Sequence, residues 1–206
     1  YSSGVAENEW QCLQKMTELL RHSGVNTPTL REIETCDAIF VLGEDLTQTA
    51  ARMALAVRQA VKGKARQKAT ELKVDVWQIA AIQNIGQNDR FPLYLTSLDS
   101  TRLDDVACVH YHAAYVDQAR LGFAVAHLLD SKAPSVPDAD DTLMLVARQI
   151  ADGLSNAKHP LIISGTTCET PALLDAAANI ASALRQKNPD VSLSLVAAEA
   201  NSVGSA

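Results

Sequence analysis

A chain of 206 residues, 47% of them hydrophobic and 4% aromatic, is long enough to bury a sizeable core made mostly of small aliphatic side chains. Its formal net charge of −6 argues against a nucleic-acid partner, because affinity for a polyanion depends on clustered Lys and Arg residues. The longest apolar stretch, residues 121–129, contains a histidine and is far shorter than the roughly 20 residues needed to cross a bilayer, so we expect no membrane insertion.

Hydrophobic spacing predicts helices and strands that alternate along the chain. A helix over residues 7–22 comes first, and a short capped helix is expected around residues 27–32. Further helices are expected at 47–62, at 116–129, from the aspartates at 138–141 to about 154, and at 170–186. Strands are expected at 38–42, 91–96, 109–112, 160–164 and 191–197.

Two of these strands, residues 39–42 and 161–163, are apolar without alternation, which is typical of strands covered on both faces in a parallel sheet. The order of elements therefore predicts the α/β class, with a doubly wound, largely parallel sheet and helices on both faces. We expect residues 1–206 to form one such domain. Because the chain begins at Tyr1 and stops soon after the last expected strand, we also expect it to be an internal fragment of a longer polypeptide.

The segment 64–90 is too long for a simple connection between a helix and a strand. Gly63 is expected to end the preceding helix, and the next ten residues are polar and basic. Apolar spacing from Trp77 to Ile85 then predicts one more helix, which Gly86 and Asn88 break. We therefore expect an inserted helical segment here.

The four cysteines, Cys12, Cys36, Cys108 and Cys168, lie far apart without a C-x-x-C spacing. Iron–sulfur clusters and structural zinc sites use closely spaced cysteines, so we expect neither in this chain. Isolated cysteines fit a reducing compartment, which predicts a cytoplasmic location.

A buried strand, a glycine turn and a helix occur twice, around Gly43 and around Gly165. In open parallel sheets, ligands bind beyond the carboxyl ends of the strands. These two turns are therefore the candidate functional site, and their side chains decide whether they suit a ligand.

The first turn, Gly43-Glu44-Asp45-Leu46, offers one glycine and two carboxylates. A phosphate-binding turn needs several glycines so that backbone N–H groups can approach the anion. The two acids would themselves occupy the positive end of the following helix and repel a diphosphate. We therefore favour a structural turn, capped by Asp45 or Thr47, over a nucleotide site.

The second turn, residues 165–170, has hydroxyl groups that could contact a ligand. Thr170 and Pro171 also form an ordinary cap followed by proline at the first helical position, and we favour that interpretation. Cys168 lies near the start of the helix and could have a lowered thiol pKa, although the sequence indicates no histidine partner for it.

His110 and His112 alternate on one strand and point to the same face, which is the one geometric hint of a metal site. No third ligand accompanies them at a convincing spacing, so we favour a structural or exposed pair. Asp104 and Asp105 are neighbours in a helical turn and should not face each other. The sequence therefore predicts no catalytic, cofactor-binding or metal-binding residue.

Four basic residues, Lys62, Lys64, Arg66 and Lys68, lie where a helix is expected to end. A favourable interaction with the helix dipole, together with solvation, is our first explanation for them. Docking to an acidic partner is the second.

Short stretches along almost the whole chain match one known family. They are residues 2–5, 9–10, 24–25, 27–34, 37–38, 41–45, 47–49, 54–66, 77–82, 101–105, 117–124 and 160–166. In these residues the chain closely resembles the family of iron–sulfur G subunits of the bacterial NADH:quinone oxidoreductases, respiratory complex I. The resemblance is to the region of those proteins that is similar to molybdopterin oxidoreductases, and it implies their Rossmann-like fold.

In working molybdenum enzymes of that superfamily, the turns that correspond to Gly43 and Gly165 help to hold the guanine dinucleotide arms of the cofactor. The usual Gly-x-Asn-Pro of the first turn is replaced here by residues 43–46. The usual Pro-Gly-Thr-Asp appears as Ala114-Tyr115-Val116-Asp117, which retains only the acidic residue. The resemblance therefore implies an inherited fold without its ligand and no cofactor in this chain.

The resemblance also implies iron–sulfur clusters in the N-terminal part of the parent chain, with electrons passing through clusters elsewhere. This part would serve structure and assembly in the peripheral arm, on the cytoplasmic side of the inner membrane. Its expected partners are other peripheral-arm subunits and the iron–sulfur portion of its own chain. An exposed apolar patch around Trp10 or Trp77 would mark a docking face.

Two alternatives stay open. One is a molybdopterin guanine dinucleotide-binding domain of an active molybdenum oxidoreductase, against which Glu44 and Asp45 argue. The other is a free-standing α/β protein that binds a small ligand and gains thermal stability from it.

Overall fold

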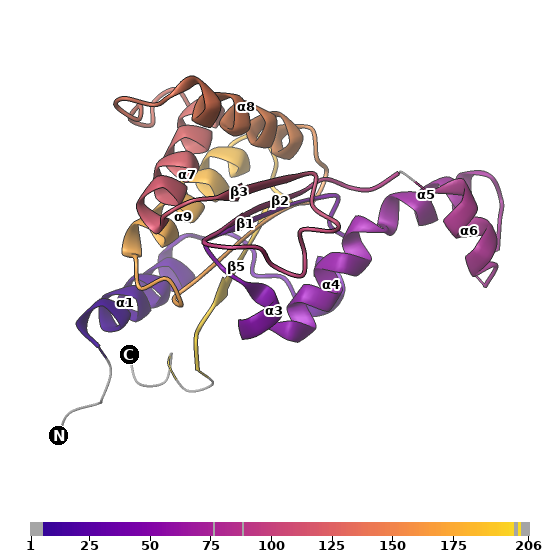
Figure 1. The fold of residues 1–206 in the computed structure, drawn as a ribbon, viewed down its shortest axis with the longest axis horizontal. Coiled ribbons are helices and arrows are strands. Elements are labelled where there is room, and N and C mark those ends of the chain that lie inside the picture. Colours follow the sequence, from indigo (N-terminus) through magenta and orange to yellow (C-terminus); the bar gives the residue numbers. More distant parts are fainter. Residues whose placement is uncertain (1–5, 76, 88, 200–201, 203–206) are drawn as a thin grey trace.

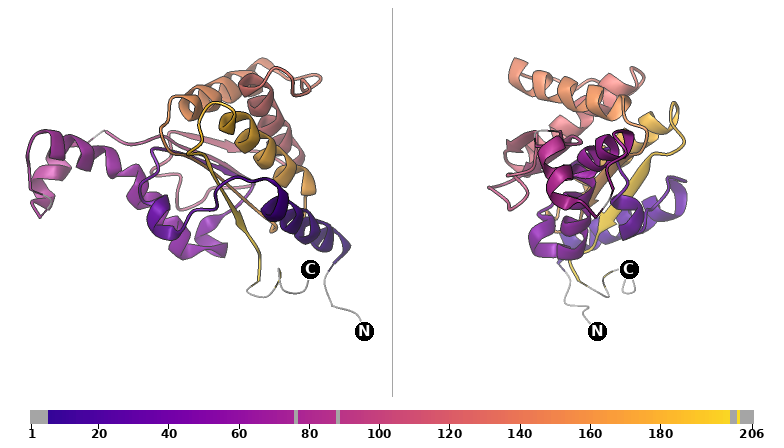
Figure 2. Two further views of the ribbon diagram at one scale, coloured as in Figure 1. Left: turned by 180° about the vertical axis from the view of Figure 1, so that it is seen from behind. Right: turned by 90° about the vertical axis from the view of Figure 1, so that its right-hand side faces the viewer.

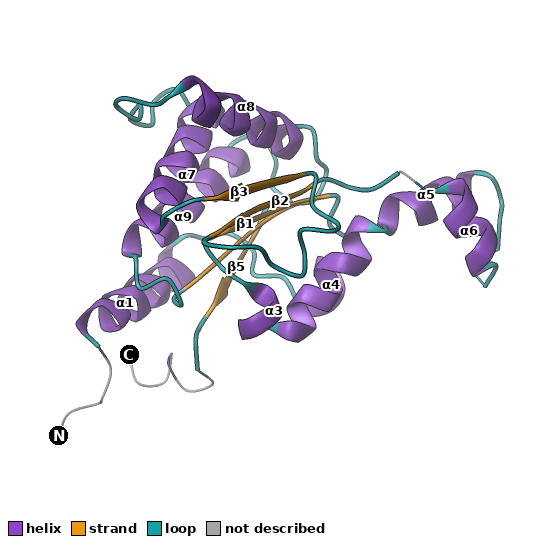
Figure 3. Cartoon of the chain, in the orientation of Figure 1, coloured by secondary structure: helices purple, strands orange, loops and turns teal. Residues whose placement is uncertain are grey.

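The structure is a computed structural model that describes residues 6–75, 77–87, 89–199 and 202. Figure 1 and Figure 3 show helices on both sides of a single sheet. The strands are β1 Ala38–Leu42, β2 Leu93–Ser97, β3 Val109–His112, β4 Pro160–Gly165 and β5 Ser192–Val196. The helices are α1 Glu7–His22, α2 Leu30–Ile33, α3 Leu46–Thr49, α4 Ala51–Val61, α5 Gly63–Glu71, α6 Ile79–Ile85, α7 Tyr115–Leu129, α8 Asp141–Ser155 and α9 Pro171–Arg185.

All five strands are parallel, in the spatial order β3-β2-β1-β4-β5. Helices α7, α8 and α9 cover one face of the sheet, and α3 and α4 lie on the other (Figure 1). The predicted α/β class and doubly wound parallel sheet are confirmed. Among the described residues, no helix combines the length and the apolar character that crossing a membrane requires.

The central strand β1 explains why its sequence is apolar without alternation. Phe40 and Leu42 pack into the cluster under α7, α8 and α9, whereas Ile39 and Val41 pack into the cluster under α4. Every residue of β1 is buried, because both faces of the strand are covered. Small alanines on the covering helices allow this close packing, as the composition predicted.

The short helix α2 begins with the predicted cap. The Thr29 hydroxyl accepts a hydrogen bond from the Glu32 N–H at 3.4 Å, and the Glu32 carboxylate accepts one from the Thr29 N–H at 2.6 Å. This reciprocal pair is a capping box, in which two backbone donors at the helix start are satisfied. The Thr29 backbone N–H, followed by the Thr29 hydroxyl, stabilises the carboxylate and lowers the pKa of Glu32.

The predicted continuous helix over residues 47–62 is wrong, because the chain breaks at Ala50 into α3 and α4. Ala50 has φ −141° and ψ 60°, outside the helical region. Within α3, the Thr47 hydroxyl donates to the Asp45 carboxylate and the Thr49 hydroxyl donates to the Asp45 carbonyl. Such local side-chain bonds compete with continued helix and account for the break.

The helix expected to end before Gly63 does end there, because α4 stops at Val61, but a further helix that was not predicted, α5, begins at Gly63 and runs through the polar stretch to Glu71. Lys, Arg, Gln, Ala and Glu are good helix formers, so a polar surface did not prevent a helix. The expected second helix near Trp77 is present as α6, and Gly86 ends it. Asn88, residues 2–5 and residues 203–206 lie outside the described residues.

Candidate functional site

The sheet has one point at which the order of strands reverses, between β1 and β4. The chain adds β2 and β3 on one side of β1, and then returns to add β4 and β5 on the other. Leu42 is paired with Ser164 at the carboxyl ends of the two strands. The glycine turns after β1 and β4 therefore lie side by side at the topological switch point, where open α/β sheets bind their ligands.

Gly43 is required at the first turn for two reasons. Its φ is +78°, which disfavours any residue with a side chain, and a Cβ there would lie 2.7 Å from Cδ1 of Leu173. The Gly43 N–H donates to the Thr96 hydroxyl at 2.8 Å. That backbone donor is therefore satisfied within the protein and does not point to an open anion site.

Glu44 occupies the space between the two turns. It is only 3% exposed, and its Oε1 accepts a hydrogen bond of 2.8 Å from the Thr167 hydroxyl of the second turn. A Cβ on Gly165 would lie 2.1 Å from Glu44 Oε2, so the carboxyl packs directly on that glycine. Within the described residues, Oε2 has no hydrogen-bond partner.

The position of Glu44 corrects the predicted role of its charge. Burial raises the pKa of the Glu44 carboxyl above its ordinary value, against the lowering effect of the Thr49 and Thr167 hydroxyls. The side chain does not lie at a helix N-terminus as expected, because it points across the switch point toward β4. It therefore fills the space between the two glycine turns.

Asp45 is the cap of α3, which confirms one of the two predicted caps. Its Oδ1 accepts hydrogen bonds from the Thr47 N–H at 2.9 Å and from the Thr47 hydroxyl at 2.6 Å. Thr47 itself belongs to the helix rather than to its cap.

The hydroxyls of the second turn bond within the protein. The Thr166 N–H donates to the Val196 carbonyl at 3.0 Å, and the Thr166 hydroxyl accepts from the Ala198 N–H at 3.1 Å. Thr170 precedes Pro171 at the start of α9, as predicted, but its hydroxyl donates to the Cys168 carbonyl and does not cap the helix. The predicted side-chain cap is wrong because the tight turn engages that hydroxyl first.

The structure does not give Cys168 the lowered thiol pKa that its place near a helix start would allow. The side chain is buried, and burial followed by the nearby Glu44 carboxyl raises the pKa of Cys168 to about 12. Its sulfur hydrogen-bonds to the Gly43 carbonyl. A buried thiol that is not paired with a cation stays protonated and is a poor nucleophile.

The two histidines of β3 are exposed and stack on each other, with ring centroids 5.2 Å apart. His112 Nε2 lies 3.2 Å from Asp104 Oδ2, whereas Asp105 pairs with Arg58 at 2.7 Å, which lowers the pKa of Asp105. The prediction that the two aspartates do not face each other is confirmed. Over the described ranges, no group of three His, Cys, Asp or Glu side chains could hold a metal ion.

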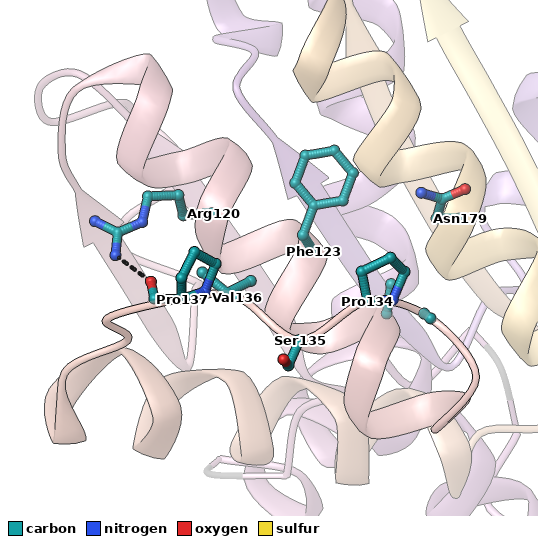
Figure 4. Close-up of a pocket in the computed structure, with 9 residues that line it drawn as sticks. Arg120, Phe123, Pro134, Ser135, Val136, Pro137 and Asn179 are labelled. Carbon is teal, nitrogen blue, oxygen red and sulfur yellow. Dashed lines mark hydrogen bonds between the residues drawn. The ribbon is translucent and has the colours of Figure 1, made fainter.

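Two hollows lie away from the switch point. The larger, about 440 Å³, lies between α7, α9 and the loop that holds Pro134 and Pro137 (Figure 4). The smaller, about 330 Å³, lies at the amino ends of β1, β4 and β5, beside Cys36, His159 and Ser192. The sequence indicates only a linker at residues 134–137, and the apolar residues around it give no signal of a hollow.

The larger hollow has little free polar chemistry. Its one charged side chain is Arg120, whose guanidinium donates to the Pro137 and Asp138 carbonyls at 3.0 and 2.9 Å. Phe123 from α7 and Asn179 from α9 complete its walls (Figure 4). The arrangement holds the loop in place.

Among solved structures, the chain is similar to one titled as the formyltransferase/hydrolase complex FhcABCD from Methylorubrum extorquens in complex with methylofuran. The similarity covers 92% of this chain and 44% of that chain, with a TM-score of 0.56 and 9% sequence identity. At this identity the likeness concerns the fold alone. No protein-family model matches the chain.

Curated relatives are much closer in sequence. The G subunit of the NADH-quinone oxidoreductase of Shewanella oneidensis is 56% identical over 98% of this chain, and the proteins of the same name from Salmonella typhimurium and Pseudomonas putida are 52% identical over 99%. The chain spans 22% of the length of the first two relatives and 23% of the third. Over nearly its whole length, this chain therefore resembles one part of the G subunit of the bacterial NADH-quinone oxidoreductases.

Proposed function

We propose that this chain is a non-catalytic structural and assembly domain of the G subunit of an NADH-quinone oxidoreductase, the respiratory complex I. One observation carries the proposal: the Glu44 side chain fills the switch point between Gly43 and Gly165. The fold retains the place where related sheets bind ligands, while the chain supplies its own occupant there.

A dinucleotide at this point would have to displace a buried side chain. The Glu44 carboxyl would lose its bond to Thr167, and the Gly43 N–H would have to leave Thr96 before it could approach a phosphate. Neither change is compensated by a basic side chain among the contacts of Glu44, Gly43 or Gly165. A phosphate would therefore enter a site without a positive partner and beside an acid.

On this proposal, the parent complex carries electrons from NADH to quinone through iron–sulfur clusters in the N-terminal part of the parent chain and in other subunits. This chain holds no cofactor and contacts that iron–sulfur portion and neighbouring peripheral-arm subunits on the cytoplasmic side of the membrane. The names of the relatives and the 22% of their length that this chain matches support the proposal.

Metal and pterin analysis of the purified full-length subunit, alone and within its complex, tests this proposal. An active molybdenum oxidoreductase produced in the same host under the same conditions serves as the positive control. We expect iron but no stoichiometric molybdenum or pterin in the subunit. Stoichiometric molybdenum and pterin guanine dinucleotide in the subunit would instead support the alternative, a cofactor-binding domain of a molybdenum enzyme.

A further inference from the structure

The two oxygens of the Glu44 carboxyl have different surroundings. Oε1 accepts the hydrogen bond of 2.8 Å from the Thr167 hydroxyl, whereas Oε2 is buried and has no hydrogen-bond partner within the described residues. An ionised carboxylate can only accept hydrogen bonds, and a buried acceptor that receives none is destabilising. The surroundings of Oε2 therefore do not suit an ionised carboxylate.

A second acceptor lies beside Oε2. A Cβ on Gly165 would lie 2.1 Å from Oε2 and 2.9 Å from the Val196 carbonyl oxygen, so both oxygens border the same small space. They repel each other when the carboxyl is ionised. When Oε2 carries a proton, the carboxyl is a donor and the Val196 carbonyl is an acceptor next to it.

The hydroxyl groups near Glu44 already have other acceptors. The Thr49 hydroxyl donates to the Asp45 carbonyl at 3.0 Å, and the Thr167 hydroxyl donates to Oε1. Because a hydroxyl has one hydrogen to donate, neither group supplies a donor to Oε2. A proton on Oε2 itself accounts for both the missing donor and the neighbouring carbonyl.

The charges around Glu44 also favour its uncharged form. Within the described part of the chain, the titratable groups that interact with its carboxyl are Asp45 in the same turn, Cys168 in the second turn and Tyr115 at the start of α7, and none of them is basic. Burial, and to a smaller extent the Asp45 charge, raises the pKa of Glu44 against the lowering effect of the threonine hydroxyls.

We propose that Glu44 is a protonated carboxyl group that links the turn after β1 to the turn after β4 and to β5, and that loss of its proton breaks this link. We call the link, formed by Glu44, Thr167 and Val196, the Glu44 bridge. Oε1 accepts from the Thr167 hydroxyl, and the protonated Oε2 donates to the Val196 carbonyl. As the pH rises, the proton passes to water and the remaining carboxylate repels that carbonyl.

The Glu44 bridge spans the two halves of the sheet. Glu44 follows β1, whereas Thr167 follows β4 and Val196 ends β5, the edge strand, which is yellow in both views of Figure 2. The bridge therefore makes the contact between the halves sensitive to pH. This inference goes beyond the proposed function, because it concerns how the switch point is held and not what the parent complex does.

Two backbone amides report on the Glu44 bridge. The Thr166 N–H donates to the same Val196 carbonyl at 3.0 Å, and the Ala198 N–H donates to the Thr166 hydroxyl at 3.1 Å. Their exchange with deuterium depends on how often the second turn opens. Because the folded-state pKa of Glu44 is raised, the stabilisation is present at low pH and is lost as the pH rises through that value.

Hydrogen exchange of the full-length subunit at pH 5 and pH 9 tests the inference. Mass spectrometry follows the peptides that contain Thr166 and Ala198, and each rate is divided by the intrinsic rate of the amide at the same pH. We expect the protection of these amides to fall about tenfold between the two pH values, while that of the β2 amides stays constant.

The substitution Glu44→Gln should keep this protection at both pH values. A glutamine amide can accept from Thr167 and donate to Val196 as the protonated acid does, and it does not titrate in this range. The matched control is Glu71→Gln, which removes an exposed carboxylate from α5 and should leave the fall in protection unchanged.

Three results would overturn the inference. The first is constant protection in the wild type, and the second is an equal fall in the wild type and in Glu44→Gln. The third is lower protection in Glu44→Gln than in the wild type at pH 9, as expected for an ionised carboxylate held by donors such as a buried water. If Glu44→Gln does not fold, the wild type decides alone, with the β2 amides as its reference. These outcomes are independent of the metal and pterin analysis.

Discussion

Glu44 makes the stability of the domain dependent on pH. Because burial raises its pKa in the folded state, the folded chain holds this proton more tightly than the unfolded chain does. The stabilisation is complete below the ordinary pKa of a glutamate and is lost as the pH rises through the raised value. The substitution Glu44→Gln removes the titration, so the fall in unfolding free energy between pH 4 and pH 8 should be smaller in this variant than in the wild type.

Urea unfolding at a series of pH values measures this effect. The control is Glu71→Gln, which removes the same charge from an exposed position on α5. An identical pH dependence in the wild type and in Glu44→Gln would show that the Glu44 carboxyl is not buried at the switch point.

Gly165 leaves room for that carboxyl. The substitution Gly165→Ala puts a methyl group where it would lie 2.1 Å from Glu44 Oε2 and 2.9 Å from the Val196 carbonyl oxygen. We expect a loss of about 1–3 kcal/mol of stability, as for other overpacked sites. Adding the substitution Glu44→Ala to the Gly165→Ala variant removes the carboxyl and should restore part of the lost stability.

Thermal unfolding of the single and double variants gives the coupling between the two sites. Gly63→Ala is the matched control, because a Cβ there meets only the Phe91 ring at 3.2 Å and alanine favours the start of α5. Purely additive effects of the substitutions at Glu44 and Gly165 would contradict their direct contact.

The cysteines should differ in reactivity by their burial. Cys108 is exposed, and burial of part of its side chain raises its pKa as well, but the buried thiols have pKa values of about 11 for Cys12 and about 12 for Cys36 and Cys168. At pH 8 we expect iodoacetamide to modify Cys108 in the native chain and the other three only after unfolding. Mass spectrometry of the peptides measures this order, and rapid native modification of Cys168 would contradict the buried second turn.

At the scale of elements, the left-handed backbone of Lys73, with a φ of 56°, should lower the stability of the end of α5. A residue with a side chain in the left-handed region costs about 1 kcal/mol relative to glycine. Lys73→Gly should therefore stabilise the end of α5 and slow hydrogen exchange of the Val74 amide, which donates to Ala69, about fivefold.

Lys73→Ala is the control for the lost charge, because alanine keeps a Cβ and should leave that exchange rate unchanged. Faster exchange in Lys73→Gly would show that the left-handed backbone of Lys73 does not limit the hydrogen bond from Val74 to Ala69.

The strands could be predicted because their side chains are constrained on both faces, as the apolar runs of β1 and β4 show. The helices were harder to predict where local hydrogen bonds or helix propensity decide where a helix begins or ends. The break at Ala50 depends on the Thr47 and Thr49 hydroxyls, and the start of α5 at Gly63 depends on helix propensity in a polar stretch. Neither signal is part of hydrophobic periodicity.

For the whole molecule, the class of fold and the two glycine turns were predictable, but the arrangement at the switch point was not. Glu44 meets Thr167 and Gly165 only because β1 and β4 are neighbours, and the spatial order of strands is not encoded in the spacing of apolar residues. The same neighbourhood buries Cys168 and raises the pKa of its thiol, although its place near a helix start would allow a lowered one.

The central claim is that the protein fills its own ligand position. An experimental structure of the complete oxidoreductase, at a resolution that shows side chains at the switch point, tests it most directly. The predicted result is a Glu44 carboxyl within hydrogen-bonding distance of the Thr167 hydroxyl and packed on Gly165. A pterin or dinucleotide with its phosphates between Gly43 and Gly165, and Glu44 turned away, would contradict it.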